Sequence, residues 1–146
     1  MAKPGSRPLS PHLQIWRWGP GMLVSILHRV TGTGLALGLG ILVWWLGALA
    51  GGQDAYDSFT AWVWPNLSEL SWSGVDILCS LIKVLLKVVL IGLTWAFFQH
   101  LLSGLRHFVL DTGAGYELKT NNTWATILPI LGVLMTAGFW AILLLR

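Results

Sequence analysis

Three long apolar stretches are the feature that most restricts how this sequence can fold. They cover residues 22–49, 76–108 and 124–146, and in the second stretch the part that fits within lipid is 84–108. A helix of about 20 apolar residues is long enough to cross the hydrocarbon core of a bilayer. We therefore predict an all-α integral membrane protein with three transmembrane helices.

The composition excludes a water-soluble domain. Of the 146 residues, 55% are hydrophobic and 10% are charged, whereas a soluble domain carries about 25% charged residues. The net charge of +3 comes from residues at the membrane borders, so it does not indicate nucleic-acid binding. The single cysteine, Cys79, excludes an intrachain disulfide and the paired-cysteine motif that attaches haem covalently.

The charges outside the spans predict the orientation. Lys3, Arg7 and Arg17 precede the first span without an acidic residue, whereas residues 50–76 carry four acidic residues and no Lys or Arg. Because positive flanks stay on the inner side, we expect the N-terminus on the cytoplasmic or matrix face of an inner membrane. The expected layout is a cytoplasmic segment 1–21, transmembrane helices 22–49, 76–108 and 124–146, an outer loop 50–75 and a cytoplasmic loop 109–123.

His100 is the clearest candidate for chemistry inside the membrane. It stands 13 residues after Lys87 and 6 before Arg106, roughly 20 Å and 9 Å along a helix axis. An ionisable side chain at that depth is costly, so its presence suggests a role. His100 shares a helix face with Gly104, His107 and Asp111. A neutral imidazole beside a glycine suits a b-type haem, although a histidine hydrogen-bonded between helices is the alternative.

A second group of polar residues lies on one helix face at the beginning of the first span. Ser25, His28, Arg29 and Gly32 follow one another at helical spacing, near the predicted cytoplasmic border. The guanidinium of Arg29 and the hydroxyl of Ser25 could donate hydrogen bonds to a haem propionate or a quinone oxygen. An arginine at this border could instead serve only to set the topology.

Only one of the four histidines lies deep enough to be an iron ligand in the membrane. His12 precedes the first span, His28 lies near the inner border of that span and His107 near the inner border of the second, which leaves His100. A six-coordinate haem would then need its second ligand from another chain. We therefore expect this protein to function in an assembly.

Two segments resemble the signature segments of the cytochrome b membrane anchor of succinate dehydrogenase, or respiratory complex II. The first combines RPLSPHLQIW at 7–16 with SILHRVTG at 25–32, and the second is HLLSGLRHFVLD at 100–111. They occur in the expected order, at the expected ends of the first and second spans. With the three-span layout, the resemblance covers most of the chain.

The resemblance implies a helix bundle with a second small anchor subunit, and attachment of an iron-sulfur subunit and a flavoprotein. It implies that His100 is an axial ligand of a haem b iron shared with the partner anchor, and that His28 and Arg29 lie near the haem. It also implies that Ser25 and Arg29 bind the ubiquinone that receives electrons from succinate. The chain alone would have no dehydrogenase activity, and the resemblance assigns no role to His12, His107 or Asp111.

Two other functions are compatible with the same layout. One is a haem-free, quinone-binding anchor of a fumarate reductase-type complex. The other is a small transporter or channel subunit in which His100 and Arg29 form a proton path, but nothing in the sequence requires a pore.

Overall fold

The computed structural model describes residues 15–74 and 76–145, and the secondary structure of these residues is entirely helical. Three helices are long and apolar enough to span a membrane, which confirms the predicted fold class. A helix satisfies its own backbone hydrogen bonds, as a segment surrounded by lipid must. The elements in chain order are α2 (Pro20–Ala50), α3 (Gln53–Val63), the 3-10 helix η1 (Leu67–Glu69), α4 (Asp76–Asp111) and α5 (Leu118–Leu144).

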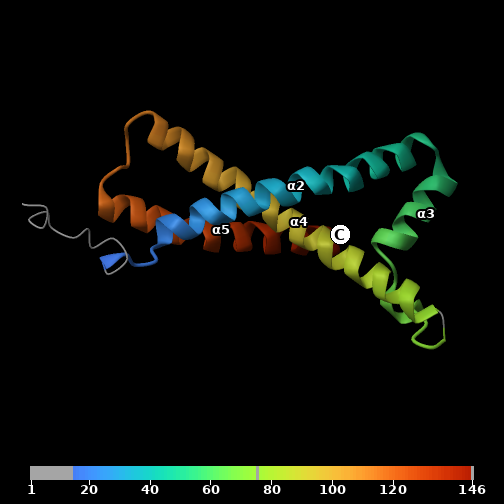
Figure 1. The fold of residues 1–146 in the computed structure, drawn as a ribbon. Coiled ribbons are helices and arrows are strands. Elements are labelled where there is room, and N and C mark those ends of the chain that lie inside the picture. Colours follow the sequence, from blue (N-terminus) through green and yellow to red (C-terminus); the bar gives the residue numbers. More distant parts are fainter. Residues whose placement is uncertain (1–14, 75, 146) are drawn as a thin grey trace, which may run out of the picture.

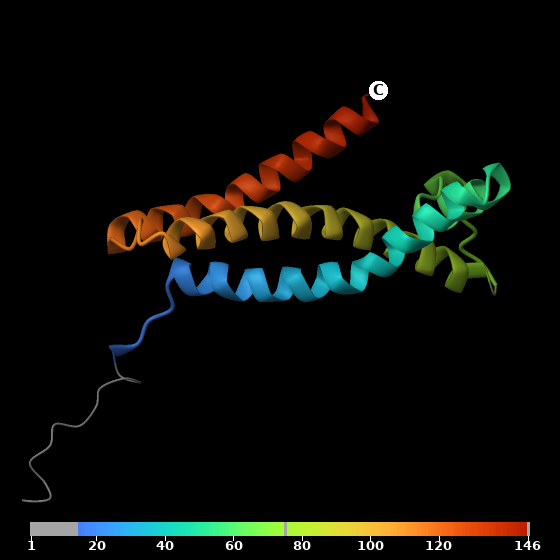
Figure 2. The same cartoon turned by 90° about the horizontal axis from the view of Figure 1, so that it is seen from above.

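Helix α4 is central to the arrangement, because it packs against both α2 and α5. Figure 2 shows α4 between the other two long helices, with the C-terminal end of α5 diverging from it. In Figure 1, α2 and α4 cross near their middles, while α3 and η1 lie at one end of the bundle and the short α4–α5 connection at the other. Residues near the crossing are therefore brought together from distant parts of the sequence.

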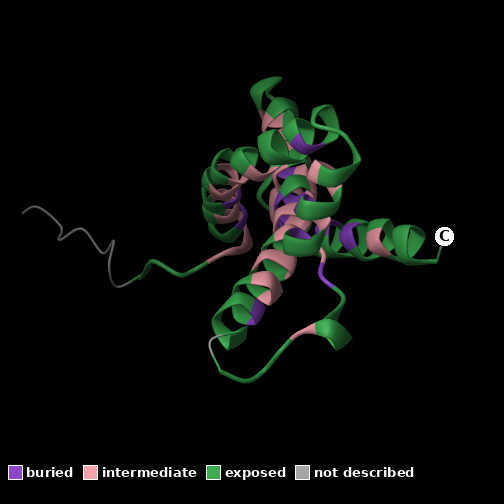
Figure 3. Cartoon of the chain, turned by 90° about the vertical axis from the view of Figure 1, so that its right-hand side faces the viewer, coloured by how far each residue is buried: buried purple, intermediate pink, exposed green. Residues whose placement is uncertain are grey.

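The bundle has a small, partly polar interior and an apolar exterior. Figure 3 shows that most of the described residues are exposed and that the few buried positions lie mainly on the helices. Small and polar residues at helix contacts, with large apolar residues outside, are what a protein surrounded by lipid requires. The buried polar residues are Thr31, Ser80, Gln99, Ser103 and Thr136.

Helix α3 closes the outer-loop end of the bundle. Its side chains Phe59 and Val63 are buried against Ala48 of α2, and the ring of Phe59 meets Trp44 edge-on with 4.9 Å between centroids. Its opposite face carries the exposed Asp54 and Asp57. An amphipathic helix of this kind suits the membrane–water interface.

The two lysines early in α4 contact tryptophans at the C-terminal end of α3. The ammonium of Lys87 lies 4.1 Å from the ring centroid of Trp64, and that of Lys83 lies 5.4 Å from the ring centroid of Trp62. These cation–π contacts tie the beginning of α4 to the end of α3.

The helices extend beyond the apolar stretches of the sequence. α2 begins at Pro20, α4 continues to Asp111, and α5 begins at Leu118, six residues before the expected start of the third span. The expected outer loop, 50–75, contains α3 and η1. Hydropathy identifies only the part of a helix that lies in lipid. Helical hydrogen bonding continues into polar flanking residues such as Lys119 and Thr120, so the helices are longer than the apolar stretches.

Candidate functional site

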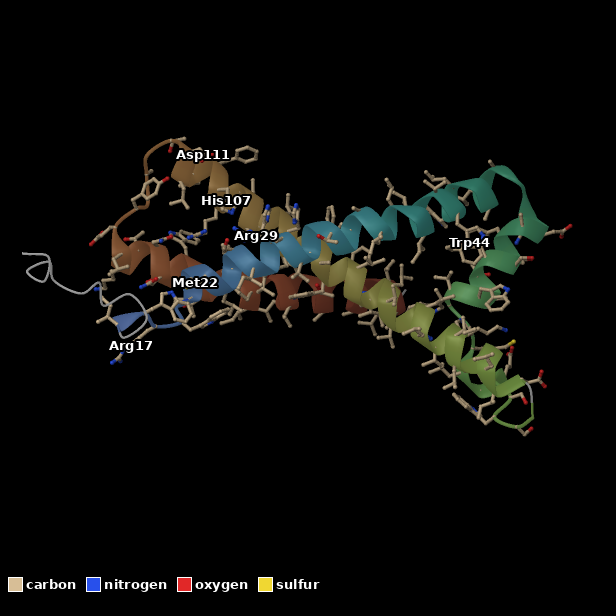
Figure 4. All side chains as sticks on the ribbon, viewed as in Figure 1. Arg17, Met22, Arg29, Trp44, His107 and Asp111 are labelled. Atoms are coloured by element: carbon tan, nitrogen blue, oxygen red, sulfur yellow. The ribbon has the colours of Figure 1, made fainter. Side chains whose placement is uncertain are left out.

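Three histidines meet where α2 approaches α4. The imidazole of His28, from α2, stacks on that of His100, from α4, with 3.9 Å between centroids and 9° between planes. His107, two turns further along α4, meets His28 at 5.1 Å and 61°. Figure 4 shows His107 and Arg29 in the half of the bundle that contains Met22 and Asp111, with Trp44 at the other end.

The hydrogen bonds of His100 determine which of its nitrogens carries the proton. Nδ1 lies 3.1 Å from the backbone oxygen of His28 and 3.2 Å from Oγ1 of Thr31. A carbonyl oxygen only accepts, and the Thr31 hydroxyl donates to the Leu27 carbonyl at 2.7 Å. Nδ1 is therefore the protonated nitrogen. In the neutral tautomer that donates from Nδ1, the lone pair is on Nε2, which has no hydrogen-bond partner among the described residues.

His28 is hydrogen-bonded to a residue of α4. Its Nδ1 lies 2.7 Å from Oγ of Ser103, whose hydroxyl faces the backbone oxygens of Gln99, at 2.8 Å, and His100, at 3.1 Å. The His28–Ser103 bond and the bond from His100 to the His28 carbonyl together tie α2 to α4 beside the stacked rings.

A glycine of α2 makes room for His100. A Cβ added to Gly32 would lie 2.9 Å from Cε1 of the His100 ring, closer than side chains approach one another. By contrast, Gly104 lies under His28, with 3.8 Å between its added Cβ and Cε1 of that ring. We expected Gly104 to leave space for a haem beside His100; in the structure the His28 ring lies near Gly104, and the His100 ring is in close contact with Gly32.

In this arrangement the His100 ring can offer its Nε2 nitrogen to a metal ion. Metal-binding histidines commonly donate their second nitrogen to a backbone carbonyl, as His100 does, because the bond fixes both the tautomer and the ring orientation. The stacking of His28 on His100 leaves no space for a porphyrin between them. Within 15–74 and 76–145, no three His, Cys, Asp or Glu side chains are grouped to hold a metal ion.

The residues expected at the quinone differ in their surroundings. Arg29 is exposed on α2, whereas Ser25, one turn earlier, is half-buried. The hydrogen bonds of the described residues include none from either side chain, so neither is tied to the histidine cluster. Asp111 is exposed at the end of α4, and His12 lies outside the described residues.

Sequence reasoning missed the polar residues that orient the histidines. Thr31 and Ser103 are buried, and Gln99 is fully buried with both amide atoms unpartnered. Thr31 stands three residues after His28, and Ser103 three after His100. That spacing places Thr31 and Ser103 each on the same helix face as a histidine, and from this spacing the sequence could have predicted their proximity to the histidines.

Comparison with known proteins gives a consistent answer. Residues 3–141 match the family described as succinate dehydrogenase/fumarate reductase transmembrane subunit. The succinate dehydrogenase cytochrome b556 subunit of Paracoccus denitrificans is 36% identical over 115 residues, which are 79% of this chain and 75% of the relative.

Two further relatives extend the match. The succinate dehydrogenase cytochrome b556 subunit of Rickettsia felis is 31% identical over 92% of this chain and 90% of the relative. The mitochondrial succinate dehydrogenase cytochrome b560 subunit of Sus scrofa is 32% identical over 93% of this chain and 71% of the relative. A match over nearly the whole chain, on a bundle of three membrane-spanning helices, places this protein in the succinate dehydrogenase/fumarate reductase transmembrane subunit family.

Proposed function

We propose that this chain is the haem b- and quinone-binding anchor of a succinate dehydrogenase, with His100 as one axial ligand of the haem iron. The observation that carries the proposal is the hydrogen bond from His100 Nδ1 to the His28 carbonyl, 3.1 Å long. It leaves the Nε2 lone pair available in a ring that cannot turn freely, because Gly32 lies against it. These are the properties an iron ligand needs.

The second axial ligand comes from another chain. Of the described histidines, His28 is the one whose ring stacks on His100. With 3.9 Å between the two centroids, a haem cannot fit between these rings. The assembly includes a second small anchor subunit, an iron-sulfur subunit and a flavoprotein. When bound, haem b supplies a site that can accept and return one electron.

The quinone binds at the cytoplasmic or matrix end of α2, near Ser25 and Arg29. The absence of hydrogen bonds from these two side chains among the described residues leaves their donors free for a quinone carbonyl oxygen. The Arg29 guanidinium stabilises negative charge that develops on that oxygen during reduction, and the Ser25 hydroxyl orients the ring. Arg29 and His28 also lie close enough in sequence to face a haem propionate from the same helix.

The protein resides in a bacterial or mitochondrial inner membrane with its N-terminus on the inner side. The support is the distribution of charge, with four acidic residues and no Lys or Arg in 50–76. Succinate is oxidised outside the membrane by the flavoprotein, and this chain provides the place where the electrons reach a quinone dissolved in lipid.

The ligand assignment is tested by a reduced-minus-oxidised absorption spectrum of the purified complex. We expect b-type bands in the wild type, their loss in His100→Tyr, and their retention in His107→Gln. The second variant is a matched control, because His107 is a histidine of the same helix that contacts only the edge of the cluster. Wild-type complex without b-type bands would instead favour a haem-free anchor of the fumarate reductase type, and unchanged bands in His100→Tyr would refute the ligand assignment.

A further inference from the structure

A second feature lies on the other side of α4, away from the histidines. A cleft of about 280 Å³ separates α4 from α5 beside the loop that joins them. Its walls are mainly leucine and valine, including Leu105, Val109 and Leu131, and polar groups enter it only from Arg106 and Asn121 among the residues that line it. An apolar cleft with polar groups at one place suits an amphipathic ligand.

Arg106 is a half-buried cation whose charge is not balanced by a carboxylate. Its Nη2 donates to the Asn121 side-chain oxygen, which is neutral, and its Nε is buried without a partner in the described part of the chain. Residues 1–14, 75 and 146 contain no Asp or Glu. An arginine in a membrane helix normally faces water or an opposite charge, because burying it alone is costly.

The acidic residue at the beginning of α5, Glu117, does not neutralise Arg106. No acidic residue occupies the first turn of α5, and the side chain of its N-cap residue, Glu117, makes no capping bond. The Glu117 carboxylate is exposed and accepts from the Thr120 hydroxyl at 3.1 Å, rather than from Arg106.

We infer that this cleft binds one anionic phospholipid, with its phosphate against Arg106 and an acyl chain along the leucine and valine wall. The guanidinium and a phosphate form paired, charge-assisted hydrogen bonds. Trp124, which also lines the cleft, is exposed at the start of α5, and indole rings favour the headgroup level. A neutral quinone would leave the charge of Arg106 unbalanced. The inference does not depend on the proposed haem or quinone sites.

The test measures lipid binding to the delipidated, purified complex by native mass spectrometry. Phosphatidylglycerol and phosphatidylcholine with the same acyl chains are titrated separately. For the wild type we expect one tightly bound phosphatidylglycerol per copy of this chain. Binding should weaken roughly tenfold in Arg106→Gln. Arg17→Gln, which removes an exposed cation outside the cleft, should leave binding unchanged.

A second variant keeps the test decisive if Arg106→Gln fails to assemble. Val109→Trp preserves the guanidinium and fills the apolar wall from its exposed side, so it should also lower phosphatidylglycerol binding. Equal binding of the two lipids would overturn the inference. So would unchanged phosphatidylglycerol binding in both Arg106→Gln and Val109→Trp. So would displacement of the lipid by inorganic phosphate, which would indicate a site for small anions. A photoreactive amino acid at Val109 that cross-links to a subunit rather than to lipid would show that protein covers the cleft.

Discussion

Replacing Gly32 with alanine perturbs the histidine cluster from the helix opposite His100. The added Cβ would lie 2.9 Å from Cε1 and 3.4 Å from Nδ1 of that imidazole, so the ring must move by several tenths of an ångström. The same atom, Nδ1, donates to the His28 carbonyl at 3.1 Å. Any displacement that relieves the contact therefore lengthens the hydrogen bond that fixes the ring.

The cost of this substitution can be worked out from the two effects. Overpacking by one methyl group costs about 1–3 kcal/mol, and a weakened hydrogen bond contributes up to about 1 kcal/mol more. The stacked His28 ring prevents the imidazole from moving freely on its other side. A total near 2 kcal/mol corresponds to roughly thirtyfold weaker retention of haem by the complex.

The assay is the haem content of the purified complex, measured from its b-type absorption per mole of flavin. Gly34→Ala is the matched control, because it lies in the same helix and its added Cβ would have no atom within 4 Å. We expect haem loss, or a shifted absorption maximum, in Gly32→Ala and neither in Gly34→Ala. Normal haem content and an unshifted spectrum in Gly32→Ala would refute the argument that this glycine positions the ligand.

Two other predictions concern the quinone site and the packing of α5. Ser25→Ala and Arg29→Leu should each lower succinate-to-quinone activity about tenfold or more while leaving reduction of a soluble dye acceptor intact; equal loss in both assays would indicate failed assembly. Gly132→Ala places a Cβ 2.9 Å from the buried side-chain oxygen of Gln99, so it should destabilise the α4–α5 contact by about 1–3 kcal/mol. Thermal unfolding of the complex measures this, with Gly138→Ala, which meets no atom within 4 Å, as the control; equal midpoints would contradict it.

The sequence was sufficient to predict the architecture because membrane residence is a local property. Apolar length alone identifies three spans, and the structure has three helices that meet this criterion. Helical periodicity also placed His100, Gly104 and His107 on one face. It was less informative for the outer loop, where α3 buries Phe59 against α2. A short amphipathic helix needs such a partner before its apolar side becomes recognisable.

What only the tertiary structure decided is how the faces of α2 and α4 meet. A histidine's depth follows from its position in the chain, but its neighbours depend on the crossing and rotation of two helices, which sequence periodicity leaves open. The crossing stacks His28 on His100, brings Thr31 to its Nδ1 and places Gly32 under its ring. The sequence alone predicted that an imidazole lies within a membrane-spanning helix, whereas helix packing determined which nitrogen of that imidazole donates to a backbone carbonyl.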